Sequence, residues 1–300
     1  MIEYDSHSWT QHFLDIKGTV VRQIFWRVML VVAWSGVVVA FHFYVRPVGV
    51  PSTVHTLIGV ALGLLLVFRT NVSYERFWEG RKLWGGIVNE SRNLARASAA
   101  FLRDRPDRLR PIILWTAAFA YASMNSLRGG RSLGPVASRL PKDEVADALS
   151  AQHIPSAVAR RITELLVKAR TDGQLTDYVV VNIDGNVQLL LDNIGGCERI
   201  QKTPLPFAYV VHLRRALILY CLTLPFALVE TYGWSTILDT LLICYVLFGI
   251  EEIGVEIENP FGEDDNDLPL EQICATIEQN LLGVIEEVIP TQALGKGAGA

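Results

Sequence analysis

Residues 54–80 read VHTLIGVALGLLLVFRTNVSYERFWEG, and this stretch decides the fold class. Its first part, Val54–Phe68, carries no charged side chain and ends abruptly at Arg69. From residue 73 to residue 102 there is no proline, and apolar residues return at helical spacing. The sequence therefore predicts a single helix that leaves a membrane-spanning segment and continues well beyond it.

Three further apolar stretches accompany Val54–Phe68, namely Val28–Val45, Ala216–Val229 and Ile237–Ile250. Each of the four is near or below the roughly 20 residues that a helix needs to span a bilayer. Half of all residues are hydrophobic and only 19% are charged, whereas a soluble chain carries about a quarter charged residues. The pattern predicts four membrane helices that pack as a bundle or line a cavity.

The basic residues predict the orientation. Most of the 27 lysines and arginines lie between Arg69 and Lys202. By the positive-inside rule, both termini and this long middle segment face the cytoplasm. We therefore expect four regions: residues 1–68 with the first two membrane helices, 69–206 as a mainly cytoplasmic helical domain, 207–256 with the third and fourth membrane helices, and 257–300 as a C-terminal cytoplasmic segment.

The middle segment carries further helical patterns, at Ile112–Ser126, Lys142–Ala151 and Ser156–Arg170. Residues 177–183, DYVVVNI, have the composition of a buried strand. No second segment of that kind offers it a partner, so we expect an all-α protein.

Several classes of site are not indicated. The basic residues do not cluster into a nucleic-acid-binding patch, and the net charge is −4. None of the four cysteines has the spacing of a zinc site. The chain has no fingerprint for a nucleotide, a phosphate loop or a catalytic serine, and its first twenty residues do not read as a cleaved signal peptide. We expect no cofactor and no enzymatic activity.

Val60, Leu64 and Phe68 form one stripe of the second membrane helix. Gly59 and Gly63 lie on an adjacent face, where small residues let another helix approach closely. On periodicity alone this is an ordinary packed helix, or a helix whose apolar stripe gates a pore by dewetting.

Acidic residues gather at the end of the fourth membrane helix and beyond it. Glu251, Glu252 and Glu256 suggest either a solvated helix end or the acidic lining of a vestibule. Residues 258–273, ENPFGEDDNDLPLEQI, lack the glycine and glutamate positions of an EF-hand loop. Their acids before Pro269 favour a negatively charged helix start over a metal site.

Three stretches together resemble the bestrophin channels, specifically their bacterial branch: FRTNVSYERFWEGRKLWGGIV (68–88), GCERIQKTPLPFAYVVHLRR (196–215) and ENPFGEDDNDLPLEQIC (258–274). The resemblance implies a homopentamer of four-span subunits around one pore. It implies a hydrophobic neck at Val60, Leu64 and Phe68. It also implies a second constriction at Tyr178, with Val180 or Val181 as alternatives, where a tyrosine departs from the small aliphatic residue usual in the family.

The resemblance also bears on the acidic stretch. Asp264 and Asp267 match the two side-chain ligand positions of the calcium clasp in animal bestrophins, whereas bacterial members are regarded as lacking calcium control. No metal is therefore favoured, and calcium at these two aspartates is the alternative.

We expect a passive channel for small monovalent ions in a bacterial inner membrane, with a slight preference for cations over chloride. Its partners would be its own copies, the lipid bilayer and the permeant ions. The alternatives are a carboxylate-metal membrane enzyme built on the acidic residues and a non-conducting membrane scaffold. Neither alternative has a motif of its own in this sequence.

Overall fold

The computed structural model describes residues 18–288, and every regular element within that range is helical. The all-α prediction is confirmed. The chain divides into two compact units, one of Met1–Phe77 with Thr203–Asp267 and the other of Trp78–Lys202 with Leu268–Ala300. The long helix α3 (Ser52–Phe101) contributes to both.

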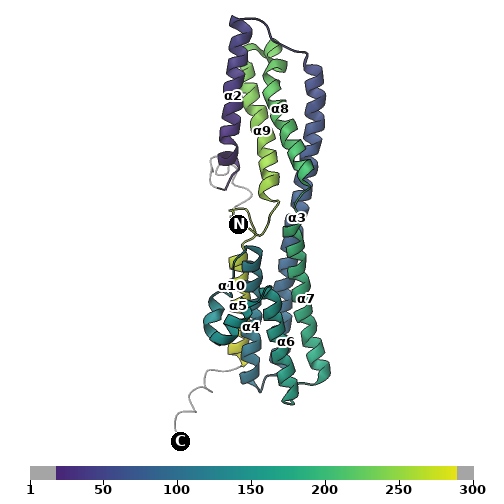
Figure 1. Cartoon of the computed structure of the whole chain (residues 1–300), viewed down its shortest axis with the longest axis vertical. Helices are drawn as coiled ribbons and strands as arrows, with labels where there is room; N and C mark the ends of the chain where they lie inside the picture. The colour runs from purple at the N-terminus through teal and green to yellow at the C-terminus, as the bar shows by residue number, and fades with distance from the viewer. Residues whose placement is uncertain (1–17, 289–300) are drawn as a thin grey trace. The chain divides into compact units, whose positions relative to one another are not determined.

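The first unit is a bundle of long apolar helices. It contains α2 (Val21–Tyr44), the first part of α3, α8 (Phe207–Tyr232) and α9 (Thr236–Glu256). Figure 1 shows α2, α8 and α9 side by side. Three helical stretches are long and apolar enough to cross a membrane: Val21–Tyr44, Ser52–Phe101 and Phe207–Glu256. The last of these comprises α8 and α9, which meet at the short 3-10 turn η2 (Gly233–Ser235).

Close helix packing holds this unit together, because lipid is as apolar as the side chains and burial alone contributes little within a membrane. Leu62 and Leu66 of α3 are buried against Leu213 and Leu217 of α8. At Gly59 an added Cβ would lie only 2.7 Å from the Tyr220 hydroxyl oxygen, so the end of a tyrosine side chain of α8 reaches α3 at this point. At Gly63 an added Cβ would have no neighbouring atom within 4 Å. The glycine pair therefore leaves room for a tyrosine side chain at Gly59, and not for a close approach of the two helix backbones.

Polar contacts join α2 to α8 and to α9. The Trp34 indole nitrogen donates to the Leu222 carbonyl at 2.9 Å, and the Ser35 and Thr240 hydroxyls lie 3.2 Å apart. These bonds satisfy groups that would otherwise be costly to keep in an apolar environment.

The second unit is a helical bundle around α4 (Pro106–Leu127). It also contains α5 (Lys142–Ser150), α6 (Ile154–Thr171), α7 (Asp177–Lys202), α10 (Leu270–Val288) and the 3-10 turn η1 (Pro135–Arg139). Proline at the start of α4 and Asp107 in its first turn suit a helix N-terminus. Trp115 and Phe119 are almost fully buried on α4, against which α6 and α10 pack. This helix is the core of the unit.

The stretch DYVVVNI forms the first turns of α7. Its buried residues continue through the helix as Val180, Ile183, Val187 and Leu190, at intervals of three and four. The helical period of the whole segment therefore prevails over the strand-like composition of seven residues.

Candidate functional site

The predicted neck residues lie on one outward face of α3. Val60 is 70% exposed, Leu64 56% and Phe68 55%. On the opposite side of the same helix, Leu62 and Leu66 are 2% and 1% exposed. The subunit thus buries one side of α3 and leaves a continuous apolar stripe without a partner inside the unit.

The residue after Phe68, Arg69, is buried although its side chain is charged. Arg69 is 1% exposed and donates from Nη1 to Glu251 Oε1 at 2.7 Å. Arg214 of α8 donates from Nε to the same oxygen at 2.9 Å. Arg27 of α2 lies 3.7 Å from Glu251 Oε2 and donates to Glu252 at 2.6 Å. We call these five residues the arginine–glutamate cluster. It joins α2, α3, α8 and α9 at one level of the bundle.

A second arginine of α3 contacts the segment that directly follows α9. Arg76 lies two turns after Arg69, on the same face of the helix. Its Nε donates to the Glu258 carbonyl oxygen at 3.1 Å. Residues 60–76 of α3 therefore present two arginines to residues 251–258 and the apolar stripe of Val60, Leu64 and Phe68 to the outside of the subunit.

The sequence suggested Glu251, Glu252 and Glu256 as vestibule acids. The structure places Glu251 at 2% exposure inside the arginine–glutamate cluster. The Glu252 side chain is 12% exposed and paired with Arg27. Glu256 accepts a hydrogen bond from the Asn266 amide at 2.9 Å. All three carboxylates are thus engaged within the subunit.

Sequence reasoning missed the partners of Glu251. In the sequence, Arg69 ends the apolar run Val54–Phe68, whereas Arg27 and Arg214 stand just before two other apolar stretches. The sequence contained one indication of this pairing. Each of the three arginines borders an apolar stretch, at the end that lies level with the C-terminal end of α9.

The acidic stretch 263–267 is a turn closed by its own side chains. Asp267 is 3% exposed, and its Oδ2 accepts a hydrogen bond from the Asp264 backbone N–H at 2.8 Å. Asn266 donates to the Gly18 carbonyl oxygen at 3.0 Å as well as to Glu256. Asp264 is exposed and lines a hollow of about 620 Å³ that Asp267 does not line. Within residues 18–288, no group of three or more histidine, cysteine or acidic side chains is placed so that it could hold a metal ion.

The three residues proposed for a second constriction lie near the start of α7. Tyr178 is 91% exposed and Val181 is 73% exposed, whereas Val180 is 9% exposed and belongs to the core of the second unit. The structure leaves Tyr178 and Val181 on the surface of the subunit.

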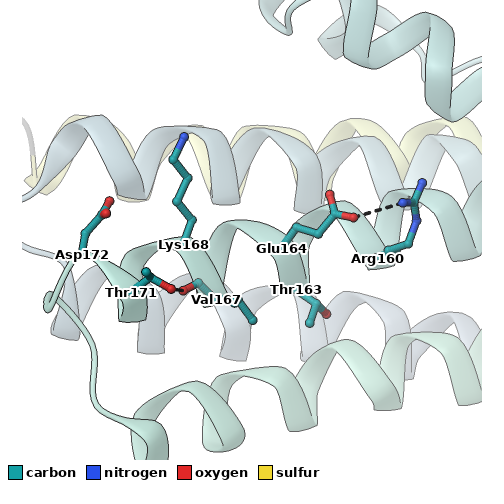
Figure 2. A pocket seen from close by; sticks show the side chains of 7 residues that line it. All are labelled: Arg160, Thr163, Glu164, Val167, Lys168, Thr171 and Asp172. Atoms are coloured by element: carbon teal, nitrogen blue, oxygen red, sulfur yellow. Dashed lines mark hydrogen bonds and ion pairs between the residues drawn. The ribbon is translucent and has the colours of Figure 1, made fainter.

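A hollow of about 440 Å³ lies along α6. Figure 2 shows the side chains that line it. Arg160 and Glu164 pair with each other at 3.1 Å across one turn, and the Thr171 hydroxyl donates to the Val167 carbonyl. The lining is a charged helix face with internal pairs, and the hydroxyl of Thr163 in this lining donates to Asp184 Oδ1 at 2.5 Å.

The histidine nearest to that helix has a structural task. His153 Nδ1 accepts from the Ser156 backbone N–H at 3.1 Å and so caps α6. Its Nε2 then donates to Glu198 at 2.6 Å. Burial alone would raise the pKa of Glu198, but the hydrogen bonds from His153 and Lys202 lower it overall.

The comparisons with known proteins agree with this architecture. Residues 1–283 match the family model described as bacterial and fungal bestrophin protein. The chain belongs to the bestrophin family. A voltage-dependent anion channel-forming protein of Nostoc is 42% identical over 279 residues, covering 91% of this chain and 90% of that protein. A protein of the same name from Synechocystis is 38% identical and is covered over 92% of its length.

This bestrophin also resembles solved structures of bacterial bestrophin homologues. A crystal structure of a bacterial bestrophin homologue from Klebsiella pneumoniae is 32% identical, with a TM-score of 0.83. The match covers 87% of this chain and 98% of that chain. The resemblance drawn from the three sequence stretches is therefore confirmed. This bestrophin is a membrane protein whose relatives carry the names of ion channels, not of enzymes.

Proposed function

We propose that this bestrophin is a passive channel for small monovalent ions, with α3 lining the pore. One observation carries the proposal. Val60, Leu64 and Phe68 form an exposed apolar stripe on a helix whose opposite face is held by a buried arginine–glutamate pair. A helix fixed in this way presents the same three side chains to whatever lies outside the subunit.

Assembly follows from the need to enclose a pore. One subunit contributes one such helix, which cannot surround an ion path alone. We propose a homopentamer of subunits with four spans each: α2, the first part of α3, α8 and α9. Each neck residue then becomes a ring of five side chains.

The neck would gate by dewetting. Rings of valine, leucine and phenylalanine offer water and ions no hydrogen bond, so a narrow apolar passage empties and blocks conduction. Tyr178 and Val181 are candidates for the second constriction at the cytoplasmic exit, because both are exposed on α7. Val180 is the weaker candidate, since it lies in the core of its own subunit.

The sign of the permeant ion has two candidates. An apolar neck carries no charge, so a preference for cations would come from acids elsewhere on the path and from the net charge of −4. We propose this slight cation preference first. Anion conduction is the second candidate, favoured by the names of the relatives and by the engagement of Glu251, Glu252 and Glu256 within the subunit.

The same proposal includes the membrane orientation. The excess of lysine and arginine between residues 69 and 202 supports a cytoplasmic position for residues 69–206 and for the C-terminal region from residue 257. Both termini would share that side of a bacterial inner membrane; residues 1–17 and 289–300 lie outside the described part of the chain.

Planar-bilayer recording of the purified protein tests the proposal. Discrete currents are expected, and their reversal potential in a potassium chloride gradient identifies the ion: a shift towards the potassium equilibrium potential supports cations, and a shift towards that of chloride supports anions. Absence of current together with bound transition metal would favour a carboxylate-metal enzyme. Absence of both would favour a non-conducting scaffold.

A further inference from the structure

A cavity of about 430 Å³ lies within the first unit, beside the arginine–glutamate cluster. Helices α2, α8 and α9 form its walls. Its apolar lining consists of Leu30, Val31, Leu217, Ile218, Leu222 and Phe248. Arg27, Arg214 and Glu251 supply the only charged groups of the lining that the described residues provide.

These two kinds of lining are separated along the helix axes. On α2, Arg27 precedes Leu30 and Val31 by one turn, and on α8, Arg214 precedes Leu217 and Ile218 by one turn. From Arg214 to Leu222 the wall extends for about 12 Å along the helix. The cavity is therefore charged at one end and apolar along the rest of its length.

The charged end has hydrogen-bonding capacity to spare. A guanidinium group carries five N–H donors. Arg214 uses Nε for Glu251, and its two terminal nitrogens have no protein partner within residues 18–288. The side chains of Arg27 and Arg214 are both 50% exposed, and the lining as a whole has two positive charges against one negative charge.

We infer that this cavity binds an anionic phospholipid. The phosphate would accept hydrogen bonds from Arg214 and Arg27, and the first part of one acyl chain would lie against Ile218 and Leu222. Two arginines suit a phosphate because their planar forks bind its oxygens in pairs. Basic pockets between membrane helices select anionic lipids for this reason.

The apolar wall decides between a lipid and a free phosphate ion. Ile218 is 50% exposed and Leu222 39% exposed within the subunit, on helices long and apolar enough to cross a bilayer. A soluble phosphate would leave this wall uncovered, whereas an acyl chain covers it. The inference concerns binding and does not depend on the proposed pore.

Native mass spectrometry of the full chain in detergent tests the inference. The protein is titrated with phosphatidylglycerol and, separately, with phosphatidylcholine of the same chain length. We expect retention of phosphatidylglycerol at concentrations at which phosphatidylcholine is lost. Arg214→Gln should weaken phosphatidylglycerol binding about tenfold, because it removes charge-assisted hydrogen bonds. Glu251 keeps Arg69 and Arg27 as partners in this variant.

Arg215→Gln is the matched control, since Arg215 is an exposed neighbour that does not line the cavity. It should leave phosphatidylglycerol binding unchanged. Ile218→Trp fills the apolar wall and should reduce retention while both arginines remain.

Four results would overturn the inference. Equal retention of the two lipids would remove the anionic selectivity, and equal losses in the Arg214 and Arg215 variants would remove the site. Glycerol phosphate binding as tightly as the lipid would indicate a free-anion site instead. A change in oligomeric mass with Ile218→Trp, without a change in lipid retention, would assign the wall to a second copy of the chain.

Discussion

Replacing Glu251 by glutamine should destabilise the protein far more than replacing the glutamate next to it. Glutamine keeps the size of the side chain and removes its charge. Arg69, at 1% exposure, would then remain buried, with Glu258 at 3.9 Å as its nearest remaining carboxylate. Arg27 and Arg214 are half exposed and can be solvated instead. The loss therefore comes mainly from one pair, Arg69–Glu251.

The magnitude follows from that geometry. Breaking a buried ion pair by removing one partner costs about 3–5 kcal/mol, because the other charge is left uncompensated. For a chain of this size, 1 kcal/mol lowers the melting temperature by about 2–4 °C. Glu251→Gln should therefore lower it by about 6–20 °C. Thermal unfolding of the full chain in detergent, followed by circular dichroism, measures this shift.

Glu252→Gln is the control, because Glu252 pairs with the half-exposed Arg27 and such pairs contribute about 1 kcal/mol or less. A double variant, Arg69→Met with Glu251→Leu, removes both buried charges and should recover most of the loss. Equal shifts for the two glutamate variants would refute the reasoning. The reasoning would also be refuted if the double variant lost as much stability as the sum of the losses in Arg69→Met alone and Glu251→Leu alone.

Three further predictions concern the neck, the assembly and the response to acid. Leu64→Ala or Phe68→Ala should raise conductance or open probability in bilayers with little change in melting temperature; a lower melting temperature with unchanged current would instead indicate ordinary packing. Mass measurement in detergent should give about five times the 33.4 kDa subunit, and a conducting monomer or dimer would contradict this. The hydrogen bond from Arg128 lowers the pKa of Glu271 below 4.5. A lowered acid pKa stabilises the fold above the unfolded value and ceases to do so as the pH falls through the folded value. Glu271→Gln should therefore flatten the acid side of the stability profile below about pH 4.5, and an unchanged profile would count against the contact.

The sequence was sufficient for the features that are local. An apolar run followed by thirty proline-free residues at helical spacing predicted the continuous helix that the structure shows as Ser52–Phe101. The family could also be predicted, because three separated stretches carried specific residues in the right order. The helix can be read within one segment, and the family can be read from three such segments taken in order.

The burial of Arg69 could not be predicted in this way. A charge at the end of an apolar run normally marks the membrane surface. Its partner Glu251 lies 182 residues away in the sequence, and nothing in either segment specifies the pairing. The exposure of the neck residues likewise depends on which face of α3 packs against α8, which the helical period alone leaves open.

The adjacency of Phe68 and Arg69 constrains how a neck on α3 could open. Consecutive residues point about 100° apart around a helix, so Phe68 is exposed while Arg69 is buried against α9. Rotating α3 by one residue would withdraw Arg69 from Glu251, at a cost of about 3–5 kcal/mol in each subunit. New side-chain rotamers at Leu64 and Phe68, or small displacements that keep the pair, avoid that cost. We therefore expect the neck to wet through movement of its side chains, while the arginine–glutamate cluster keeps the orientation of α3 unchanged.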